Sequence, residues 1–339
     1  MKKVFQLIVL VSLLVACDSD QDKAGRFFIK GNEALNQGQY NEAVRYYTEA
    51  IALAPSMKEA YNNRGVAYYK DGRYAEAIND YSYALVQIDE HYADAIRNRA
   101  NAYLADHRHS KAIEDLNRLQ RIYPDSSFVY FTKGIALHED KAYAEAIDAF
   151  EKALTMQPND AEAMVNQANS FYMLQEFEQA EQLLNRAESI DASEPNIYNT
   201  RGLIAMEKKE YSNALNWFNI ALRMDPGNAY YLNNRGYLYL QMNRISAAEE
   251  DLRRAIIGAP NNAWAYRNRG YYFHLNKRYE DAIRNFELAA KMDNEVPLLH
   301  FYWAQTLQSL NRGEEACEIL SRETTTLPEV EDLRQQVCR

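Results

Sequence analysis

Residues 227–260 read GNAYYLNNRGYLYLQMNRISAAEEDLRRAIIGAP, and the spacing of their small and apolar residues decides the fold. Gly236 is followed after 12 residues by Ala248 and after four more by Leu252. Residues four apart lie on one face of a helix, so the stretch predicts helix, turn and helix. The pattern recurs about every 34 residues, with its small residue at Gly31, Gly65, Ala100, Gly134, Ala168, Gly202, Gly236, Gly270 and Ala304.

Helix pairs of this kind are expected to stack. Gly or Ala at the helix crossing lets larger residues interlock around it, and the remaining apolar stripe is buried only by the next pair. We expect nine pairs over residues 24–330 in one elongated all-α array, with one inserted residue between Ala84 and Ala100. Residues 331–339 are predicted to form a C-terminal capping helix. Proline is expected to close six pairs, at Pro55, Pro124, Pro158, Pro226, Pro260 and Pro328.

The pattern resembles that of the tetratricopeptide repeat family. In family terms the small residue is the eighth position, the alanine exemplified by Ala248 is the twentieth, and Ala50 and Ala221 fill the twenty-seventh. The resemblance implies a right-handed superhelical solenoid of about nine helix-turn-helix repeats.

The N-terminus reads MKKVFQLIVLVSLLVAC, with Lys2 and Lys3 before an apolar run that ends at Ala16. The run is too short to span a bilayer, so residues 1–16 are predicted to be a signal peptide. Its end resembles the bacterial lipobox, which implies cleavage, acylation of Cys17 and a lipid anchor. Residues 17–23 are expected to form an acidic tether, and the sequence leaves open whether the inner or the outer membrane of the cell envelope is the target.

Composition and motifs disfavour nucleic-acid binding and catalysis. The 339 residues carry 38 Lys and Arg against 48 Asp and Glu, a net charge of −10 that repels polyphosphates. Phosphate loops, nucleophile elbows and zinc-ligand spacings are absent from the sequence. We therefore expect no enzyme activity, no cofactor and no metal site, and we interpret His107 and His109 as part of a polar turn.

A basic residue precedes most of the small residues, as at Arg64, Arg99 and Arg235. Each of these three is followed after 16 residues by an aspartate: Asp80, Asp115 and Asp251. We expect structural ion pairs across each helix pair rather than a nucleic-acid site.

Asparagine recurs at the position just before these basic residues. In the tetratricopeptide repeat family this is the sixth position, which lines the concave groove. We call this row of residues the asparagine ladder. It resembles a row of asparagines in the repeats of O-linked N-acetylglucosamine transferases, which implies that the side-chain amides bind the main chain of an extended partner. The alternative is that asparagine is merely frequent in such strings. The predicted groove residues are Asn63, Asn98, Asn166, Asn234, Asn268, Arg97, Asn101, Tyr237, Arg267 and Tyr271.

Two functions are compatible with this sequence. The first is a membrane-anchored, non-enzymatic scaffold or assembly adaptor that binds other envelope proteins. Lipoproteins of this architecture resemble pilus or secretin assembly factors and adaptors of cell-wall hydrolases. The second is a regulatory subunit that binds a glycan or another small ligand through Tyr230, Tyr237, Trp264 and Tyr271.

Cys317 and Cys338 are the thiols that remain once Cys17 is acylated. An even pair in an exported chain predicts a disulfide that ties the cap to the last repeat. Two buried free thiols are the alternative.

Overall fold

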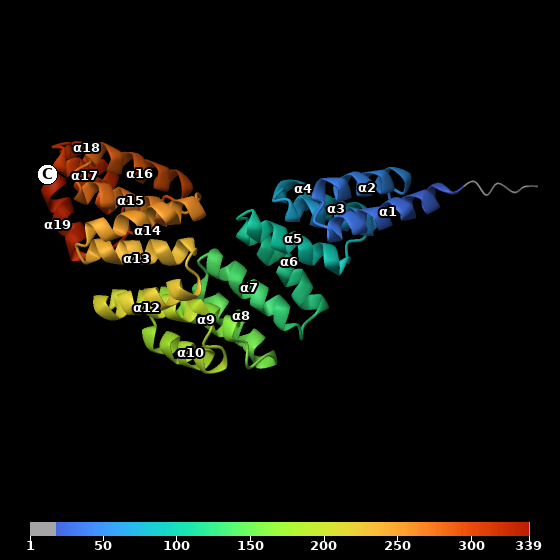
Figure 1. The fold of residues 1–339 in the computed structure, drawn as a ribbon, viewed down its shortest axis with the longest axis horizontal. Coiled ribbons are helices and arrows are strands. Elements are labelled where there is room, and N and C mark those ends of the chain that lie inside the picture. The colour runs from blue at the N-terminus through green and yellow to red at the C-terminus, as the bar shows by residue number, and fades with distance from the viewer. Residues whose placement is uncertain (1–17, 339) are drawn as a thin grey trace, which may run out of the picture. The chain divides into compact units, whose positions relative to one another are not determined.

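The computed structural model describes residues 18–338, and every regular element in that range is helical (Figure 1). The prediction of an all-α chain is confirmed. The chain divides into two compact units, one extending to Met156 and the other beginning at Gln157. The predicted signal peptide, residues 1–16, and the lipidation site Cys17 lie outside the described residues.

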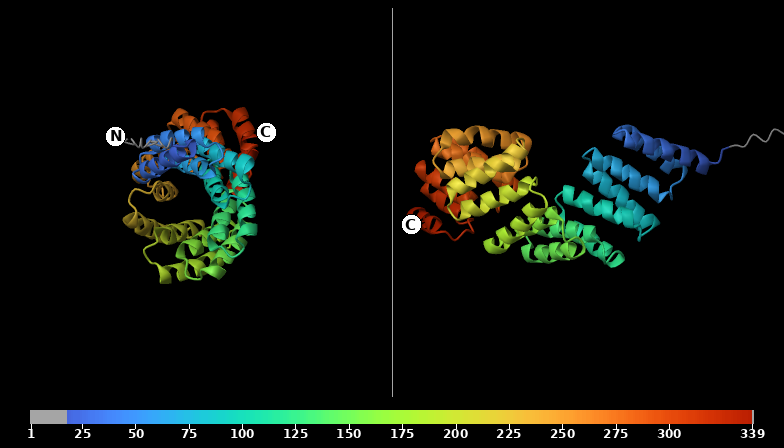
Figure 2. Two further views of the ribbon diagram at one scale, coloured as in Figure 1. Left: turned by 90° about the vertical axis from the view of Figure 1, so that its right-hand side faces the viewer. Right: turned by 60° about the horizontal axis from the view of Figure 1, so that its bottom comes forward.

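The helices form consecutive antiparallel pairs, and Figure 2 shows them stacked pair upon pair within each unit. The first unit contains α1 (Asp20–Asn36), α2 (Tyr40–Leu53), α3 (Lys58–Lys70), α4 (Tyr74–Tyr83), α5 (Ala93–Ala105), α6 (His109–Ile122), α7 (Ser127–Glu139) and α8 (Tyr143–Met156). The second contains α9 (Ala161–Met173), α10 (Phe177–Ile190), α11 (Pro195–Glu207), α12 (Tyr211–Met224), α13 (Ala229–Gln241), α14 (Ile245–Gly258), α15 (Ala263–Leu275), α16 (Tyr279–Met292), α17 (Leu299–Ser309), α18 (Gly313–Leu320) and α19 (Pro328–Val337). Residues 18–338 thus contain the nine predicted pairs and a terminal helix. Among these helices, none has the length and apolar character needed to cross a bilayer.

Each pair closes where a small residue faces a fully buried large one. A Cβ added to Gly202 would lie 2.5 Å from the ring of Phe218, and one added to Gly270 would lie 2.4 Å from the ring of Phe286. The backbones therefore approach closely enough that only glycine fits against an aromatic ring. Where alanine replaces glycine, as at Ala100, the opposing residue is the smaller Leu116.

The turn inside each pair uses one residue in the left-handed conformation. Two of these residues are glycines, Gly38 and Gly72. The other turns hold a side chain at φ between 55° and 63°: His107, Lys141, Gln175, Lys209, Asn243, Lys277 and Asn311. His107 therefore has a conformational role in its turn, and the turn prediction for this residue agrees with the structure.

The insertion in the second repeat is absorbed by a π-helical turn, η1 (Ala84–Ile88), which continues α4. A π turn takes one extra residue into a helix without moving the next helix out of register. As a result, Ala84 and Ala100 both remain buried in the packing of this repeat.

Two predicted boundaries are wrong. Helix α1 begins at Asp20 within the expected tether, because Ser19 and Asp22 form a reciprocal capping box at its N-terminus. The terminal helix begins at Pro328, three residues before the expected start, because proline fits the first turn of a helix, where its missing N–H is not needed. Pro328 therefore starts a helix instead of closing a repeat.

The predicted ion pairs between the two helices of a repeat are present. Arg64 donates to both carboxylate oxygens of Asp80 at 2.7 and 2.8 Å. Arg99 with Asp115, and Arg235 with Asp251, repeat this geometry at 2.7–2.8 Å. All three aspartates are buried, so these pairs belong to the interior of the repeat and not to its rim.

The last repeat is tied to the terminal helix as predicted. Cys317 in α18 and Cys338 directly after α19 form a disulfide with a Cα separation of 5.0 Å. Val330 and Leu333 of α19 are buried in the same core as Phe301 and Leu320. The disulfide therefore fixes a helix that covers the end of the apolar core.

Candidate functional site

In each pair we call the helix that comes first in the chain the first helix and the other the second helix. The predicted binding face is the side of the first helices that faces away from the second helices, and we call it the first-helix face. In the first unit it belongs to α1, α3, α5 and α7. In the second unit it belongs to α9, α11, α13, α15 and α17.

The predicted asparagines lie where neighbouring first helices meet. Asn63 donates its amide to Asn32 at 2.9 Å, and Asn98 donates to Asn62 at 2.9 Å. Asn62 also donates to Asn63 at 3.1 Å. One N–H of each of these amides thus links successive repeats, and since an amide has two N–H groups and a carbonyl, polar capacity remains for a partner.

The second unit repeats this network and extends it. Asn268 donates to Asn233 at 2.8 Å, Asn233 to Asn234 at 3.4 Å, and Asn234 to Asn199 at 2.9 Å. Asn166 instead donates to the carbonyl of Glu162 in its own helix. The ladder therefore has a packing role at four of the five positions, a role that the sequence pattern did not predict.

Arg267 and Asn268 are buried, with exposed fractions of 2% and 1%. The guanidinium of Arg267 donates twice to the Asn268 carbonyl oxygen and once to the Pro297 carbonyl. It also lies against the rings of Tyr237 and Trp264, at 4.6 and 4.9 Å from their centroids. In this conformation neither residue is available to a partner, so their inclusion in an exposed groove is wrong.

Tyr237 and Tyr271 are joined through Tyr302. The hydroxyl groups of Tyr237 and Tyr302 lie 2.9 Å apart, and the rings of Tyr271 and Tyr302 stack at 4.1 Å. Burial raises the pKa of Tyr302 above its ordinary range. Of the four aromatic residues considered for a small ligand, Tyr230 and Trp264 remain exposed, whereas Tyr237 and Tyr271 take part in packing within the second unit.

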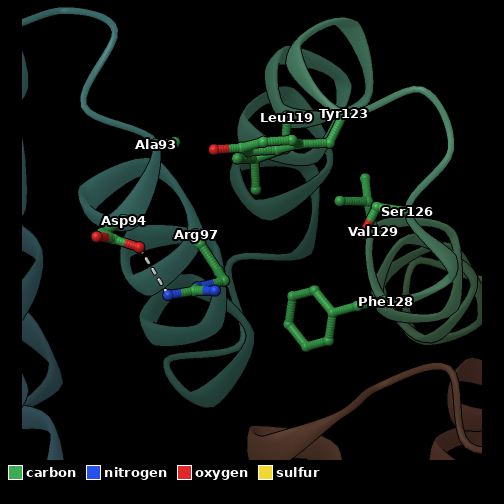
Figure 3. A pocket seen from close by; sticks show the side chains of 8 residues that line it. All are labelled: Ala93, Asp94, Arg97, Leu119, Tyr123, Ser126, Phe128 and Val129. Atoms are coloured by element: carbon green, nitrogen blue, oxygen red, sulfur yellow. Dashed lines mark hydrogen bonds and ion pairs between the residues drawn. The ribbon is translucent and has the colours of Figure 1, made fainter.

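Arg97 stands in a different environment, at a pocket of about 200 Å³ (Figure 3). Its guanidinium, half-exposed, pairs with Asp94 at 2.7 Å. The rings of Tyr123, just after α6, and Phe128, in α7, form the other walls and are 48% and 44% exposed. Asn98 and Asn101 follow Arg97 on α5, and both are half-buried.

Phe128 and Tyr123 were not among the site residues predicted from the sequence. Phe128 occupies the position that Asp94 holds one repeat earlier. This position lies outside the buried apolar stripe, so an aromatic side chain there is exposed. That departure from the polar residue of the neighbouring repeat was the available signal. It marks an apolar side chain left at the surface, and such side chains in a pocket are typical of binding sites.

Among residues 18–338, clusters of three or more His, Cys, Asp or Glu able to hold a metal ion are absent. The rings of His107 and His109 lie 6.0 Å apart.

The comparisons with known proteins agree with this geometry. Residues 30–93, 97–161 and 233–297 match one tetratricopeptide repeat family, residues 137–204 a second, and residues 195–228 a third. The chain belongs to the tetratricopeptide repeat family.

Curated relatives match this repeat chain over short stretches. A heat shock protein sti1 homologue from Schizosaccharomyces pombe is 38% identical over 22% of this chain and 13% of its own length. Hsp70-Hsp90 organizing protein 1 from Arabidopsis thaliana is 43% identical over 15% of this chain and 9% of its own length. The matches thus span about a tenth of these two relatives.

Solved structures show the same fold for the repeat array. The Cut9-Hcn1 assembly of the APC/C aligns with a TM-score of 0.62 at 14% identity, over 93% of this chain and 76% of the other. PilF from Pseudomonas aeruginosa aligns with a TM-score of 0.50 at 20% identity, over 62% of this chain and 96% of the other.

Proposed function

We propose that this tetratricopeptide repeat chain is a non-enzymatic adaptor that holds extended segments of partner proteins on its first-helix face. The observation that carries the proposal is the pocket between α5 and α7, where Tyr123 and Phe128 present exposed rings beside Arg97. Aromatic rings and arginine are the side chains enriched at protein-binding surfaces.

The pocket chemistry favours an apolar side chain next to an acidic one. The two rings provide a wall for the apolar group, while the guanidinium lies within the same pocket. The Arg97–Asp94 pair is largely exposed, and exposed pairs contribute only about 0–1 kcal/mol. A carboxylate of the partner can therefore compete for Arg97 at little energetic cost.

The asparagine network supports this role by fixing the spacing of the first helices. Because Asn98 is hydrogen-bonded to the preceding first helix, the part of α5 that carries Arg97 is held in place next to it. A pre-organised face loses less entropy on binding than a mobile one. The free N–H and carbonyl of Asn98 then remain for the partner's main chain.

The binding proposal is tested with two capped, fluorescein-labelled peptides, one repeating Leu-Glu and one repeating Leu-Lys. We expect fluorescence anisotropy to show saturable binding of the Leu-Glu peptide. Phe128→Ala and Arg97→Glu should each weaken it at least about tenfold, the loss that 1.4 kcal/mol corresponds to. Ile257→Ala on α14 and Arg45→Glu on α2 are the matched controls, since both side chains are exposed on second helices.

Equal binding of both peptides, or equal affinity of the Phe128 and Arg97 variants and the controls, would contradict the proposal. Circular dichroism of each variant establishes that the helices are intact before affinities are compared.

We further propose that the protein is anchored to a bacterial envelope membrane through acylated Cys17. The apolar run before Cys17 and the basic residues at its start support this proposal. Because α1 begins at Asp20, only Asp18 and Ser19 would separate the lipid from the first repeat, which would hold that repeat close to the bilayer. Cys17→Ser should move the protein from the membrane fraction to the soluble fraction and abolish incorporation of labelled palmitate.

A further inference from the structure

Besides Arg201, three basic residues that precede the small residue of a repeat have a residue other than a carboxylate 16 positions later: Lys30 with Tyr46, Lys133 with Ala149 and Arg269 with Asn285. Lys133 of α7 stands in the column of residues that precede the small residue of each repeat. Four arginines of the column pair with a carboxylate: Arg64 with Asp80, Arg99 with Asp115, Arg201 with Glu188, and Arg235 with Asp251. At Lys133 both carboxylate positions are changed, because Ala149 lies 16 residues later and Gln120 lies 13 residues earlier.

At the position where other repeats have aspartate, this repeat has the smaller Ala149, and a cavity lies next to the lysine. A cavity of about 680 Å³ lies between α6, α7 and α8, and Lys133, Gln120 and Ala149 all line it. These three helices follow one another in the first unit (Figure 1). At Arg269 the aspartate is also missing, but there the amide of Asn285 accepts from the guanidinium at 2.6 Å and takes its place.

Lys133 belongs to a chain of hydrogen bonds among residues that line this cavity. The ammonium of Lys133 donates to the Gln120 carbonyl oxygen at 2.9 Å, and the Gln120 amide donates to the Tyr130 hydroxyl at 3.3 Å. Burial lowers the pKa of Lys133. A half-buried ammonium with a neutral amide as its partner gains from an added anion, since charged hydrogen bonds are stronger than neutral ones.

We propose that the cavity between α6, α7 and α8 binds a carboxylate group, which takes the place of the missing aspartate and accepts a hydrogen bond from Lys133. The carboxylate comes from a small organic acid or from an acidic side chain of a partner protein. The site is separate from the first-helix face, because its walls are α6, α8 and the side of α7 that packs on them.

Three carboxylates of α8 that also line the cavity restrict the ligand further. Glu145, Asp148 and Glu151 of α8 line it together with Lys152. Their negative charge repels phosphates and nucleotides, which carry several charges, more strongly than it repels a single carboxylate. A singly charged acid on a neutral body is the ligand that this combination favours.

The test is an NMR titration of the purified protein with propionate, with the capped peptide acetyl-Ala-Glu-Ala-amide and with inorganic phosphate. We expect saturable shifts of the Gln120 side-chain amide with at least one of the two carboxylates. Propionate alone would identify a small acid as the source, and tighter binding of the peptide would identify an acidic side chain. Saturable binding of phosphate with equal affinity, or no saturable shift with either carboxylate, would overturn the proposal.

Three variants distinguish this site from general charge effects. Lys133→Gln removes the ammonium, and Ala149→Asp supplies the missing carboxylate from within the chain; each should weaken carboxylate binding at least tenfold. Lys111→Gln on α6 changes the net charge equally at an exposed position paired with Glu114, and should leave binding unchanged. If Ala149→Asp fails to fold, Lys133→Gln decides alone, and binding that persists in Lys133→Gln refutes the assignment.

Discussion

Replacing Gly202 by alanine tests the close crossing of α11 and α12. The new Cβ would lie 2.5 Å from Cε1 of Phe218, whose ring is completely buried. Overpacking a core of this kind costs about 1–3 kcal/mol, whereas replacing glycine by alanine inside a helix gains up to about 1 kcal/mol. We therefore expect Gly202→Ala to lower the free energy of unfolding by roughly 1–2 kcal/mol.

A second substitution should repair the first. In three other repeats an alanine at the small position faces a leucine: Ala100 with Leu116, Ala168 with Leu184 and Ala304 with Leu320. Phe218→Leu should therefore remove the clash made by Gly202→Ala. The double variant is expected to be more stable than the sum of the two single effects by at least about 1 kcal/mol, a coupling typical of residues in contact.

The assay is urea denaturation followed by circular dichroism, for the wild type, both single variants and the double variant. Gly25→Ala in α1 is the matched control, because an added Cβ there meets nothing within 4 Å. Its helix-propensity gain of about 0.5–1 kcal/mol should appear as stabilisation. If Gly202→Ala is as stabilising as the control, or if the two effects in α11 and α12 simply add, the close-crossing argument is refuted.

Three further predictions concern the disulfide, a half-buried histidine and a buried ion pair. Reduction, or Cys338→Ser, should cost roughly 3 kcal/mol for the loop closed with Cys317, seen as faster hydrogen exchange confined to α19; unchanged exchange there would contradict it. Burial lowers the pKa of His274 from 6.5, so the unfolded state takes up a proton first and stability should fall as the pH drops below about 6.5. The urea midpoint measured at pH 8 and pH 5.5 should differ less in His274→Gln than in the wild type. Asp115→Ala leaves the half-buried guanidinium of Arg99 without its carboxylate and should cost about 3–5 kcal/mol in urea denaturation, whereas a cost below 1 kcal/mol would mean that the pair behaves as a surface pair.

Much of the candidate site depends on contacts between repeats. Asn63 and Asn98 share a repeat position with Asn268, yet only Asn268 is buried. Its side chain accepts from Arg267, which in turn lies against the Tyr237 ring of another repeat. A periodic sequence pattern predicts the same surroundings for every residue at a given repeat position. Coverage by side chains two repeats away, such as Tyr302 against Tyr237, is not encoded in the period.

The sequence by itself determined the nine helix pairs and the ion pairs 16 residues apart, and it predicted the disulfide of the terminal helix. These features depend on residues within one repeat or in adjacent helices, where spacing along the chain fixes which side chains meet. Only the tertiary structure decided the pocket at Arg97 and Phe128, the hollow at Lys133 and the division of the chain after Met156, across which the 34-residue period runs unbroken. The physical reason is that exposure, cavities and unit boundaries depend on how side chains of several repeats fill the space between helices. The period of the sequence does not fix the combined volume of those side chains.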